Sequence, residues 1–384
     1  MNNENHSISA ETKSPSFGGV RGGRIIMAGG GTGGHIFPAI AIANALKGLN
    51  GDVEILFVGA RGKMEMEKVP QAGYKIEGLD ISGFNRSSLI KNLGLPFKLV
   101  KSFFQVKRIF KHFKPDAVIG VGGYSSFPVL RYAQMQGIKT FIHESNSFAG
   151  RSNRLLGKKA TKIFVATDGM EAFFPAERLI VTGNPVRPAI ANAINTDKAT
   201  ALAAFGLQTG KPTVLVVGGS LGARSINEAV DQHLDDLVAN DVQVIWQTGK
   251  LYTQQAAERV KGKKGIWAGD FIAEMDKAYA AADVVISRAG AMSVAELCVV
   301  GKPVVFVPYP FAAEDHQTVN AMHLVNKGAA LMIKDSEAKE KVVPMVLDLI
   351  RDEGARNSLK VAIAQYAVQN ADVHVATEVL KSLD

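Results

Sequence analysis

The chain has 384 residues, a formal net charge of +8 and 47% hydrophobic residues. This length suffices for two domains that each bury a core, and 38 glycines are normal for an α/β enzyme with many turns between strands and helices. The single cysteine, Cys298, excludes an intramolecular disulfide and a cysteine-rich metal site, and no apolar run is long enough to span a bilayer.

The first half of the chain predicts one parallel sheet. Residues 1–22 are polar and lack an apolar signal core, so we expect a disordered extension there and no export signal. From residue 24 onward, short β-rich runs alternate with helical stretches, which favours parallel strands. The expected strands are 24–28, 54–59, 74–79, 117–121, 140–143, 162–165 and 179–181. The expected helices are 34–49, 63–72, 97–113, 128–136 and 150–156.

A second series of strands and helices follows a stiff connector at 184–188, Asn-Pro-Val-Arg-Pro, where proline fixes the backbone. Its expected strands are 212–217, 243–247, 265–268, 284–287 and 303–307. Its expected helices are 225–237, 275–282, 293–300 and 317–327, with further helices within 337–384. We therefore expect a first domain over 23–186, a second over 187–366, and a C-terminal helix, 367–384, that packs back on the first domain.

Two glycine-rich turns, 29–35 and 218–224, each follow an expected strand and open an expected helix. Such a turn presents main-chain N–H groups and the positive end of the helix dipole, which suits a phosphate or a developing anion. Two of them predict two Rossmann-like halves facing each other across a cleft. Neither turn has Walker A spacing, and the first lacks both the dinucleotide spacing and a well-placed acidic residue, so NAD is not favoured.

Acid–base candidates lie in the first half. His35 begins the helix after the first turn, and a helix N-terminus keeps an imidazole neutral and able to accept a proton. Its alternative role is to cap the turn. Glu144 and Asn146 follow the strand 140–143, at the sheet edge where ligands gather in α/β folds, so sugar contact and acid–base work are both open for them. For His143 two explanations stay open: a role in this site, and a buried side chain whose hydrogen bonds are satisfied by its neighbours.

Candidates for binding a sugar diphosphate lie further along the chain. Arg187 and Ser220 suit the diphosphate, although Ser220 also suits a turn or a helix cap. Glu296 lies one turn into the helix after the small-residue turn at 287–290, where it can accept ribose hydroxyls or simply favour the helix. The polar residues 314–317 suit a sugar or a helix cap. With no Asp-x-Asp triplet and no His-x-x-x-His pair, we expect no metal.

The stretch 86–114 contains eight Lys or Arg, no Asp or Glu, and many aromatic and aliphatic residues. Three explanations fit this pattern. It is a nucleic-acid surface without a recognisable nucleic-acid fold, a surface that lies on anionic lipid, or a core helix with a solvated basic face.

Six motifs in one order carry a family resemblance; they are 30–39, 143–146, 183–187, 218–224, 287–296 and 315–317. Over about 24–375 the chain resembles the bacterial N-acetylglucosaminyltransferases that convert lipid I to lipid II in peptidoglycan synthesis. The resemblance implies a GT-B fold and an inverting β(1→4) transfer, without a cofactor, from UDP-N-acetylglucosamine to the C4 hydroxyl of MurNAc in undecaprenyl-pyrophosphoryl-MurNAc-pentapeptide. Two features depart from the family: Ser145 stands where Gln is more frequent, and the N-terminal extension is unusual.

Carried over by position, the resemblance implies a set of donor-binding residues: Thr32, Gly33, Gly34, Asn146, Arg187, Ser220, Ile272, Ala291, Met292, Ser293, Val294, Ala295, Glu296 and Gln317. The main chain of Ile272 would contact uracil and Glu296 the ribose, while Asn146 and Gln317 would bind sugar hydroxyls. His35 is the preferred general base and Glu144 the alternative.

The resemblance also places the protein at the cytoplasmic face of the plasma membrane, peripherally, with the cell-wall synthesis machinery as a further partner and no nucleic acid. A lipid-linked acceptor leaves the bilayer only at ~0.8 kcal/mol per exposed CH₂, which favours the lipid-surface explanation of 86–114. The expected docking residues are Lys98, Lys101, Phe103, Phe104, Lys107 and Arg108. The competing functions are another GT-B transferase with a different nucleotide sugar, an epimerase acting on UDP-N-acetylglucosamine alone, and a non-catalytic nucleotide-sugar-binding protein.

Overall fold

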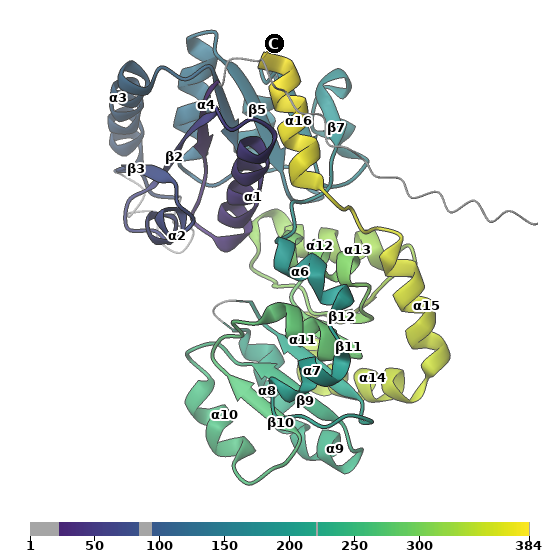
Figure 1. The fold of residues 1–384 in the computed structure, drawn as a ribbon. Helices are drawn as coiled ribbons and strands as arrows, with labels where there is room; N and C mark the ends of the chain where they lie inside the picture. Colours follow the sequence, from purple (N-terminus) through teal and green to yellow (C-terminus); the bar gives the residue numbers. More distant parts are fainter. Residues whose placement is uncertain (1–22, 84–93, 220–221, 384) are drawn as a thin grey trace, which may run out of the picture.

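Two parallel sheets, one in each half of the chain, organise the computed structural model, which describes residues 23–83, 94–219 and 222–383 (Figure 1). The first sheet has the strand order β3-β2-β1-β4-β5-β6-β7. Its strands are β1 (Arg24–Ala28), β2 (Glu54–Ala60), β3 (Lys75–Leu79), β4 (Ala117–Gly120), β5 (Lys139–Glu144), β6 (Lys162–Val165) and β7 (Leu179–Val181). The central strands β1 and β4 are apolar and buried, as expected of a sheet covered on both faces.

Helices cover both faces of this first sheet. One face packs against α1 (Gly33–Leu49) and α16 (Ala371–Leu383), and α2 (Glu65–Gln71) adds Val69 to the same core. The other face packs against α3 (Leu95–Phe113), α4 (Ser126–Met135) and α5 (Arg151–Gly157). The glycine turn between β1 and α1 therefore stands between two packed layers.

The second sheet repeats the arrangement, with the order β10-β9-β8-β11-β12-β13. Its strands are β8 (Thr213–Val217), β9 (Gln243–Gln247), β10 (Ile266–Gly269), β11 (Val284–Ser287), β12 (Val304–Phe306) and β13 (Leu331–Met332). One face carries α6 (Pro188–Asn192), α7 (Lys198–Ala203), α11 (Met275–Ala281), α12 (Ala291–Val300) and α13 (His316–Val325). The other face carries α8 (Arg224–Gln232), α9 (Leu234–Ala239), α10 (Thr253–Val260) and α14 (Ala338–Arg351), and α15 (Glu353–Ala364) contributes to both cores.

The expected fold class, two Rossmann-like parallel-sheet halves, is confirmed by this topology. In each half the strand order reverses beside the strand that feeds a glycine-rich turn, between β1 and β4 and between β8 and β11. Ligands of open α/β sheets bind at such switch points, outside the carboxyl ends of the strands. The two turns singled out in the sequence therefore lie where a ligand is expected.

Several predicted boundaries were wrong. The helix expected over 225–237 is interrupted at His233, whose Nδ1 lies 2.8 Å from Asp236 Oδ2, so that α8 and α9 are separate. The helix expected from 293 begins at Ala291. Four elements were missed: α6 and α7 after the connector, α10, whose only buried residue is Ala256, and β13, which has two residues and thus no alternation to detect.

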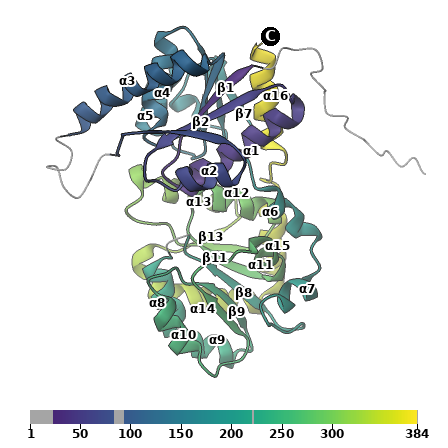
Figure 2. The same ribbon diagram turned by 60° about the vertical axis from the view of Figure 1, so that its left-hand side comes forward.

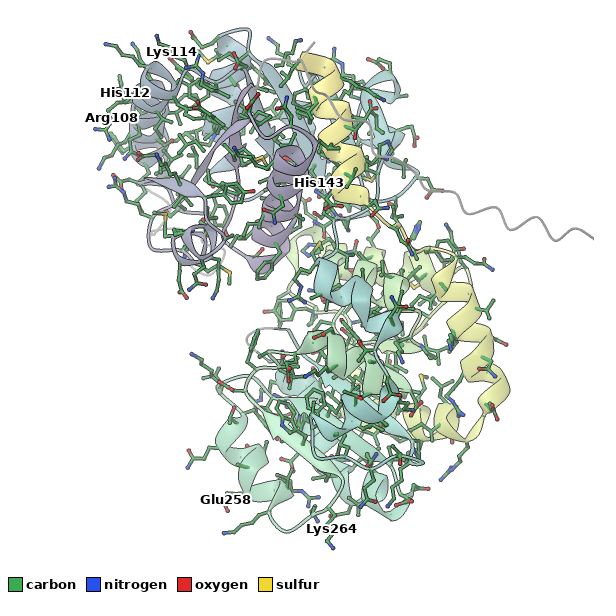
Figure 3. The ribbon with its side chains drawn as sticks, in the orientation of Figure 1. Arg108, His112, Lys114, His143, Glu258 and Lys264 are labelled. Carbon is green, nitrogen blue, oxygen red and sulfur yellow. The ribbon has the colours of Figure 1, made fainter. Side chains whose placement is uncertain are left out.

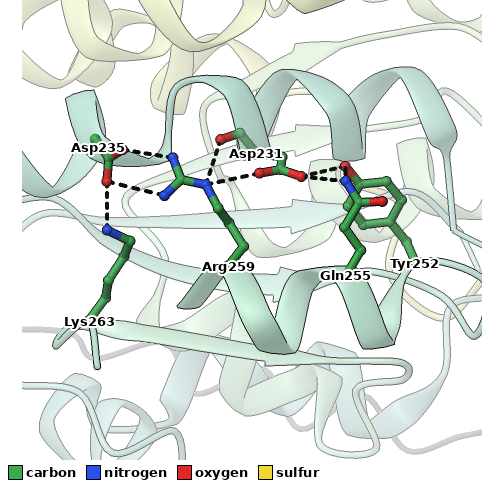
Figure 4. A network of polar contacts seen from close by, with 6 residues as sticks. All are labelled: Asp231, Asp235, Tyr252, Gln255, Arg259 and Lys263. Atoms are coloured by element: carbon green, nitrogen blue, oxygen red, sulfur yellow. Dashed lines mark hydrogen bonds and ion pairs between the residues drawn. The ribbon is translucent and has the colours of Figure 1, made fainter. Parts of the chain in front are cut away.

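A polar network ties α10 to α8 and α9 (Figure 4). Arg259 Nε donates to Asp231 Oδ1 at 3.0 Å, and Arg259 Nη2 donates to Asp235 Oδ2 at 2.8 Å. Lys263 also binds Asp235, and these hydrogen bonds, above all that from Arg259, lower the pKa of Asp235 to about 2. Tyr252 donates to Asp231 at 2.7 Å. The helix that follows the second glycine turn is thus held by charged contacts as well as by its apolar face.

The last helix returns to the first half of the chain, and both views show α16 beside α1 (Figures 1 and 2). Its buried side chains Val375, Ala376, Val379 and Leu380 belong to the core of the first sheet. Glu378 accepts a hydrogen bond from Lys162 at 2.7 Å. The chain reaches α6 through 182–187 and α16 through 365–370; the domain boundaries expected at 186/187 and 366/367 stay a prediction, and 1–22 lie outside the described residues.

We expect Leu380→Ala to lower the free energy of unfolding by ~2–4 kcal/mol, because it removes a buried side chain from a core that cannot fully collapse. Urea titration followed by far-UV circular dichroism measures this effect. Lys381→Ala, one residue along on an exposed position, should change it by less than about 0.5 kcal/mol. Equal stability of the two variants would contradict a structural role for α16.

Candidate active site

The first glycine turn lies in main-chain contact with the segment that follows β4. Gly30 N donates to Gly122 O at 3.3 Å, and a Cβ on Gly123 would lie 2.3 Å from Gly30 O. Gly30, Gly122 and Gly123 all have positive φ, which side chains rarely tolerate. Gly123 must be glycine because its Cβ would overlap the main chain of Gly30, whereas a Cβ on Gly122 would lie 2.8 Å from the His35 ring.

His35 follows this turn in the first helical turn of α1. Its Nδ1 lies 3.2 Å from Gly30 O and 3.2 Å from Thr32 Oγ1, and Thr32 is the residue before the helix begins at Gly33 and Gly34. Burial lowers the pKa of His35, and the nearby Glu144 carboxylate is the largest opposing influence. The imidazole is therefore neutral at neutral pH and able to accept a proton.

Glu144 organises the loop after β5. Its carboxylate accepts four hydrogen bonds, from the main-chain N–H and side-chain amide of Asn146 at 3.1 and 3.2 Å, from Gly150 N at 3.1 Å and from Asn153 Nδ2 at 2.9 Å. A carboxylate offers about four lone-pair sites, so these donors occupy it. The geometry supports His35 over Glu144 as the proton acceptor.

Asparagines join this loop to the second half of the chain. Asn320 on α13 accepts from Ser147 N at 3.0 Å and donates to Asn146 Oδ1 at 3.3 Å. Asn184 Nδ2 donates to Ser145 O at 2.9 Å and to Ala291 O on α12 at 3.5 Å. Sequence reasoning missed Asn320, although its position three residues after Gln317 places both on neighbouring turns of one helix.

Arg187 and Glu296, expected separately at a diphosphate and a ribose, are paired with each other. Arg187 Nη2 and Nε donate to Glu296 Oε1 at 2.9 and 3.2 Å, and Tyr279 donates to Glu296 Oε2 at 3.2 Å. The guanidinium also lies 5.5 Å from the ring centre of Phe37 on α1. Burial and Glu296 raise the pKa of Tyr279 well above its usual value, so its hydroxyl remains a donor. Arg187 thus contacts both halves.

The second glycine turn is also shaped by close main-chain contact, since a Cβ on Gly222 would lie 2.2 Å from Thr248 O. Gln247, which sequence reasoning missed, donates to Gly219 O at 2.9 Å and accepts from Ile272 N at 3.1 Å. The N–H of Ile272 is therefore already bound within the protein. Ser220 lies outside the described residues.

The remaining expected donor-site residues lie at the starts of α12 and α13. Gly290 precedes α12, so its first residues are Ala291, Met292, Ser293, Val294 and Ala295, all half-buried. Gln317 lies in the first turn of α13, where its Oε1 accepts from Tyr309 N at 3.0 Å. Both helix N-termini follow strands of the second sheet.

A cavity of about 320 Å³ adjoins these contacts and is lined by both halves. Its lining includes Ser145 and Asn184 from the first half, Ala291 and Asn320 from the second, and Tyr366 from the segment before α16. The described ranges contain no group of three His, Cys, Asp or Glu placed to hold a metal ion.

The outer face of α3 is both basic and apolar. Phe97, Val100 and Phe104 are 80, 57 and 69% exposed, while Val106, Ile109 and Phe110 pack inward. Of the expected docking residues, Lys98, Lys101, Phe104, Lys107 and Arg108 are exposed and Phe103 is half-buried. Lys101 pairs with Asp80 at 2.9 Å. Figure 3 shows Arg108, His112 and Lys114 at the outer side of this helix, and residues 84–93 lie outside the described residues.

Comparisons with known proteins agree with this architecture. Residues 25–165 match the glycosyltransferase family 28 N-terminal domain, and residues 213–374 match the glycosyltransferase family 28 C-terminal domain. The chain is 52% identical, over 94% of its length and 98% of the relative's, to the UDP-N-acetylglucosamine--N-acetylmuramyl-(pentapeptide) pyrophosphoryl-undecaprenol N-acetylglucosamine transferase of Parabacteroides distasonis. The crystal structure of Acinetobacter baumannii MurG is similar at 31% identity and a TM-score of 0.75, covering 94% of this chain and 99% of that one.

The chain belongs to the MurG-type transferases of glycosyltransferase family 28. The family resemblance read from the six motifs is thereby confirmed. A UDP-GlcNAc 2-epimerase from Neisseria meningitidis is also similar in structure, at 16% identity and a TM-score of 0.66 over 93% of this chain and 100% of that one. At that identity the likeness shows only that the two-sheet fold is common to transferases and epimerases.

His143, the first residue of the motif 143–146, is fully buried beside the site. Its Nε2 lies 3.3 Å from Gly183 O and its Nδ1 lies 3.3 Å from Ser145 Oγ. Burial lowers its pKa to about 4. Of the two explanations left open by the sequence, these contacts favour a buried and satisfied side chain.

We expect His143 to make the protein less stable as the pH falls below about 6.5. Between that value and pH 4, His143 is protonated in the unfolded chain but neutral in the folded protein. This difference lowers the free energy of unfolding by about 2 kcal/mol at pH 5. His143→Gln should therefore flatten the pH dependence of the unfolding free energy between pH 7 and 5. The exposed His374→Gln should leave it unchanged; parallel slopes for all three proteins would refute the assignment.

Proposed function

We propose that this chain transfers N-acetylglucosamine from UDP-N-acetylglucosamine to the C4 hydroxyl of MurNAc in undecaprenyl-pyrophosphoryl-MurNAc-pentapeptide, with inversion. The observation that supports this activity is the 52% identity, over nearly the whole chain, to a transferase named for that reaction. The roles of individual residues rest on the geometry of this structure. The UDP-GlcNAc 2-epimerase of similar fold is only 16% identical.

The donor diphosphate lies between the two glycine turns in this proposal. Departure of UDP concentrates negative charge on the diphosphate, and Arg187 with the N-termini of α8 and α12 would stabilise that charge. Arg187 uses two of its five N–H groups on Glu296, so others remain to bind phosphate oxygens. Glu296, held by Tyr279, receives the ribose hydroxyls.

His35 removes the proton from the attacking hydroxyl. Its lowered pKa keeps the ring neutral, and its contacts through Nδ1 leave Nε2 for the acceptor. Glu144 fixes the Asn146 loop, so that Asn146 and Gln317 contact the sugar from the two halves. Deprotonation of the nucleophile and stabilisation of the leaving group then occur at opposite sides of the anomeric carbon, as inversion requires.

The acceptor is reached at the membrane surface through α3. Exposed Phe97, Val100 and Phe104 enter the headgroup region, and Lys98, Lys107 and Arg108 bind anionic lipid. No helix within the described residues is long and apolar enough to cross a bilayer. We place the protein peripherally at the cytoplasmic face of the plasma membrane, where a nucleotide sugar and a lipid-linked acceptor meet.

A UDP-release assay tests the reaction. UDP should form only when both UDP-N-acetylglucosamine and a lipid-linked MurNAc-pentapeptide acceptor are present. His35→Ala should lower kcat by about 10²–10⁴-fold while the affinity for UDP stays within about threefold, because general-base catalysis contributes on that scale. Sugar conversion without acceptor would support the epimerase, and no turnover under any condition would support the binding protein.

Replacing Lys98, Lys101, Lys107 and Arg108 with Glu should weaken binding to phosphatidylglycerol vesicles, since each basic residue near an anionic surface contributes about 1 kcal/mol. Activity on a soluble, short-chain acceptor should survive. A matched variant carries Glu at four exposed lysines of the second half: Lys250, Lys261, Lys264 and Lys339. It has the same net charge as the first variant but should bind the vesicles far better. Equal loss of activity on both acceptors would refute the docking role.

A further inference from the structure

A buried carboxylate outside every motif described above contacts the first glycine turn. Glu65, the first residue of α2, is 1% exposed. Its Oε2 accepts the N–H of Gly31 at 2.9 Å and its Oε1 accepts the N–H of Ala60 at 3.0 Å. Burial of a charged group is costly unless hydrogen bonds replace its water, and bonds to an ionised acceptor are stronger than neutral ones. Glu65 thus joins β2 to the turn after β1.

The main chain is shaped around this side chain. A Cβ on Gly30 would lie 2.2 Å from Glu65 Oε1, and a Cβ on Gly59 would lie 2.5 Å from Glu65 Cγ. No real Cβ approaches another atom so closely, so glycine at both positions is required by the presence of Glu65. Gly30 of the first turn is therefore needed to make room for an acidic side chain of the protein itself.

One peptide group connects Glu65 to His35. The N–H of Gly31 and the carbonyl of Gly30 belong to the same planar trans peptide, so they point in opposite directions. The N–H faces Glu65 and the carbonyl lies 3.2 Å from His35 Nδ1. A carbonyl oxygen only accepts hydrogen bonds, so this contact is a hydrogen bond only when the proton is on Nδ1, which leaves the lone pair on Nε2.

We propose that Glu65 is a positioning residue for His35, because its carboxylate fixes the Gly30–Gly31 peptide in the orientation that selects the Nδ1–H form of the imidazole. This inference rests on the proposed function, in which Nε2 of His35 takes the proton of the acceptor hydroxyl. The arrangement does the work of a carboxylate that orients a catalytic histidine directly, with a peptide group inserted between them. Rotation of that peptide would leave Nδ1 without its acceptor.

Charge adds to this geometric role. Glu65 is among the groups that raise the pKa of His35 against the lowering effect of burial, after Glu144 and the Gly30 carbonyl. Loss of its negative charge should therefore lower the pKa of His35 further and make it a weaker base.

The wild-type protein gives the first test. ¹⁵N NMR of histidine-labelled protein reads the protonation of each ring nitrogen, and His35→Gln identifies the signals by their disappearance. We expect His35 to be neutral at pH 7.5 with its proton on Nδ1. A proton on Nε2 would overturn the proposal whatever the activity of the enzyme, so this result is independent of the proposed function.

The second test compares Glu65→Gln with Glu67→Gln, which removes the same charge from an exposed position in the first turn of the same helix. A glutamine can accept from one of the two N–H groups but presents its own NH₂ to the other. Glu65→Gln should lower kcat by at least ~10-fold, leave KM for UDP-N-acetylglucosamine within about threefold, and move the acidic limb of the kcat/KM profile to lower pH. Glu67→Gln should match the wild type.

Three outcomes separate the explanations. An unmoved acidic limb and unchanged ring-nitrogen signals in Glu65→Gln would overturn the proposal, even if kcat falls through general destabilisation. If Glu65→Gln fails to fold, the wild-type ring-nitrogen signals decide. Full activity of His35→Ala would instead refute the base assigned under the proposed function, while the tautomer measurement would still report on Glu65.

Discussion

Close approach of main chains at the first switch point is the constraint on which the rest of the structure depends. The turn after β1 touches the main chain of the segment after β4, and a Cβ on Gly29 or on Gly123 would overlap the opposite main chain. This contact brings the start of α1 to the edge of the sheet, and with it His35 and Phe37. Phe37 in turn contacts Arg187, so the same constraint governs where the two halves meet.

The site is built from charges that the protein has already compensated. Glu144 is bound by four donors, Glu296 by Arg187 and Tyr279, and Glu65 by two main-chain N–H groups. A site whose polar groups are oriented before the substrate arrives needs little reorganisation during the reaction. These three carboxylates therefore hold loops and partner side chains in place, and His35, which its lowered pKa keeps neutral, is the base of the proposed reaction.

The sequence predicted the periodic parts of the fold and the residue types of the site, but not the pairs that they form. Strands such as 24–28 and 162–165 were predicted to the residue because apolar β-rich runs end at turn residues. β13 and α10 were missed because two residues and one buried alanine carry no period. Arg187 and Glu296 were both predicted as site residues, yet their mutual ion pair spans 109 positions and depends on tertiary packing. Glu65 and Gln247 belong to no motif, and only the geometry of the glycine turns reveals them.

The return of α16 also determines how the chain can be divided. Because Val375, Val379 and Leu380 complete the core beneath α1, a fragment cut at the connector after β7 would expose an apolar strip along its first helix. Separate expression of the two halves would thus yield an aggregation-prone N-terminal piece unless residues 371–383 were supplied in trans or fused to it. The boundary drawn on the linear chain is not the boundary of an autonomous folding unit.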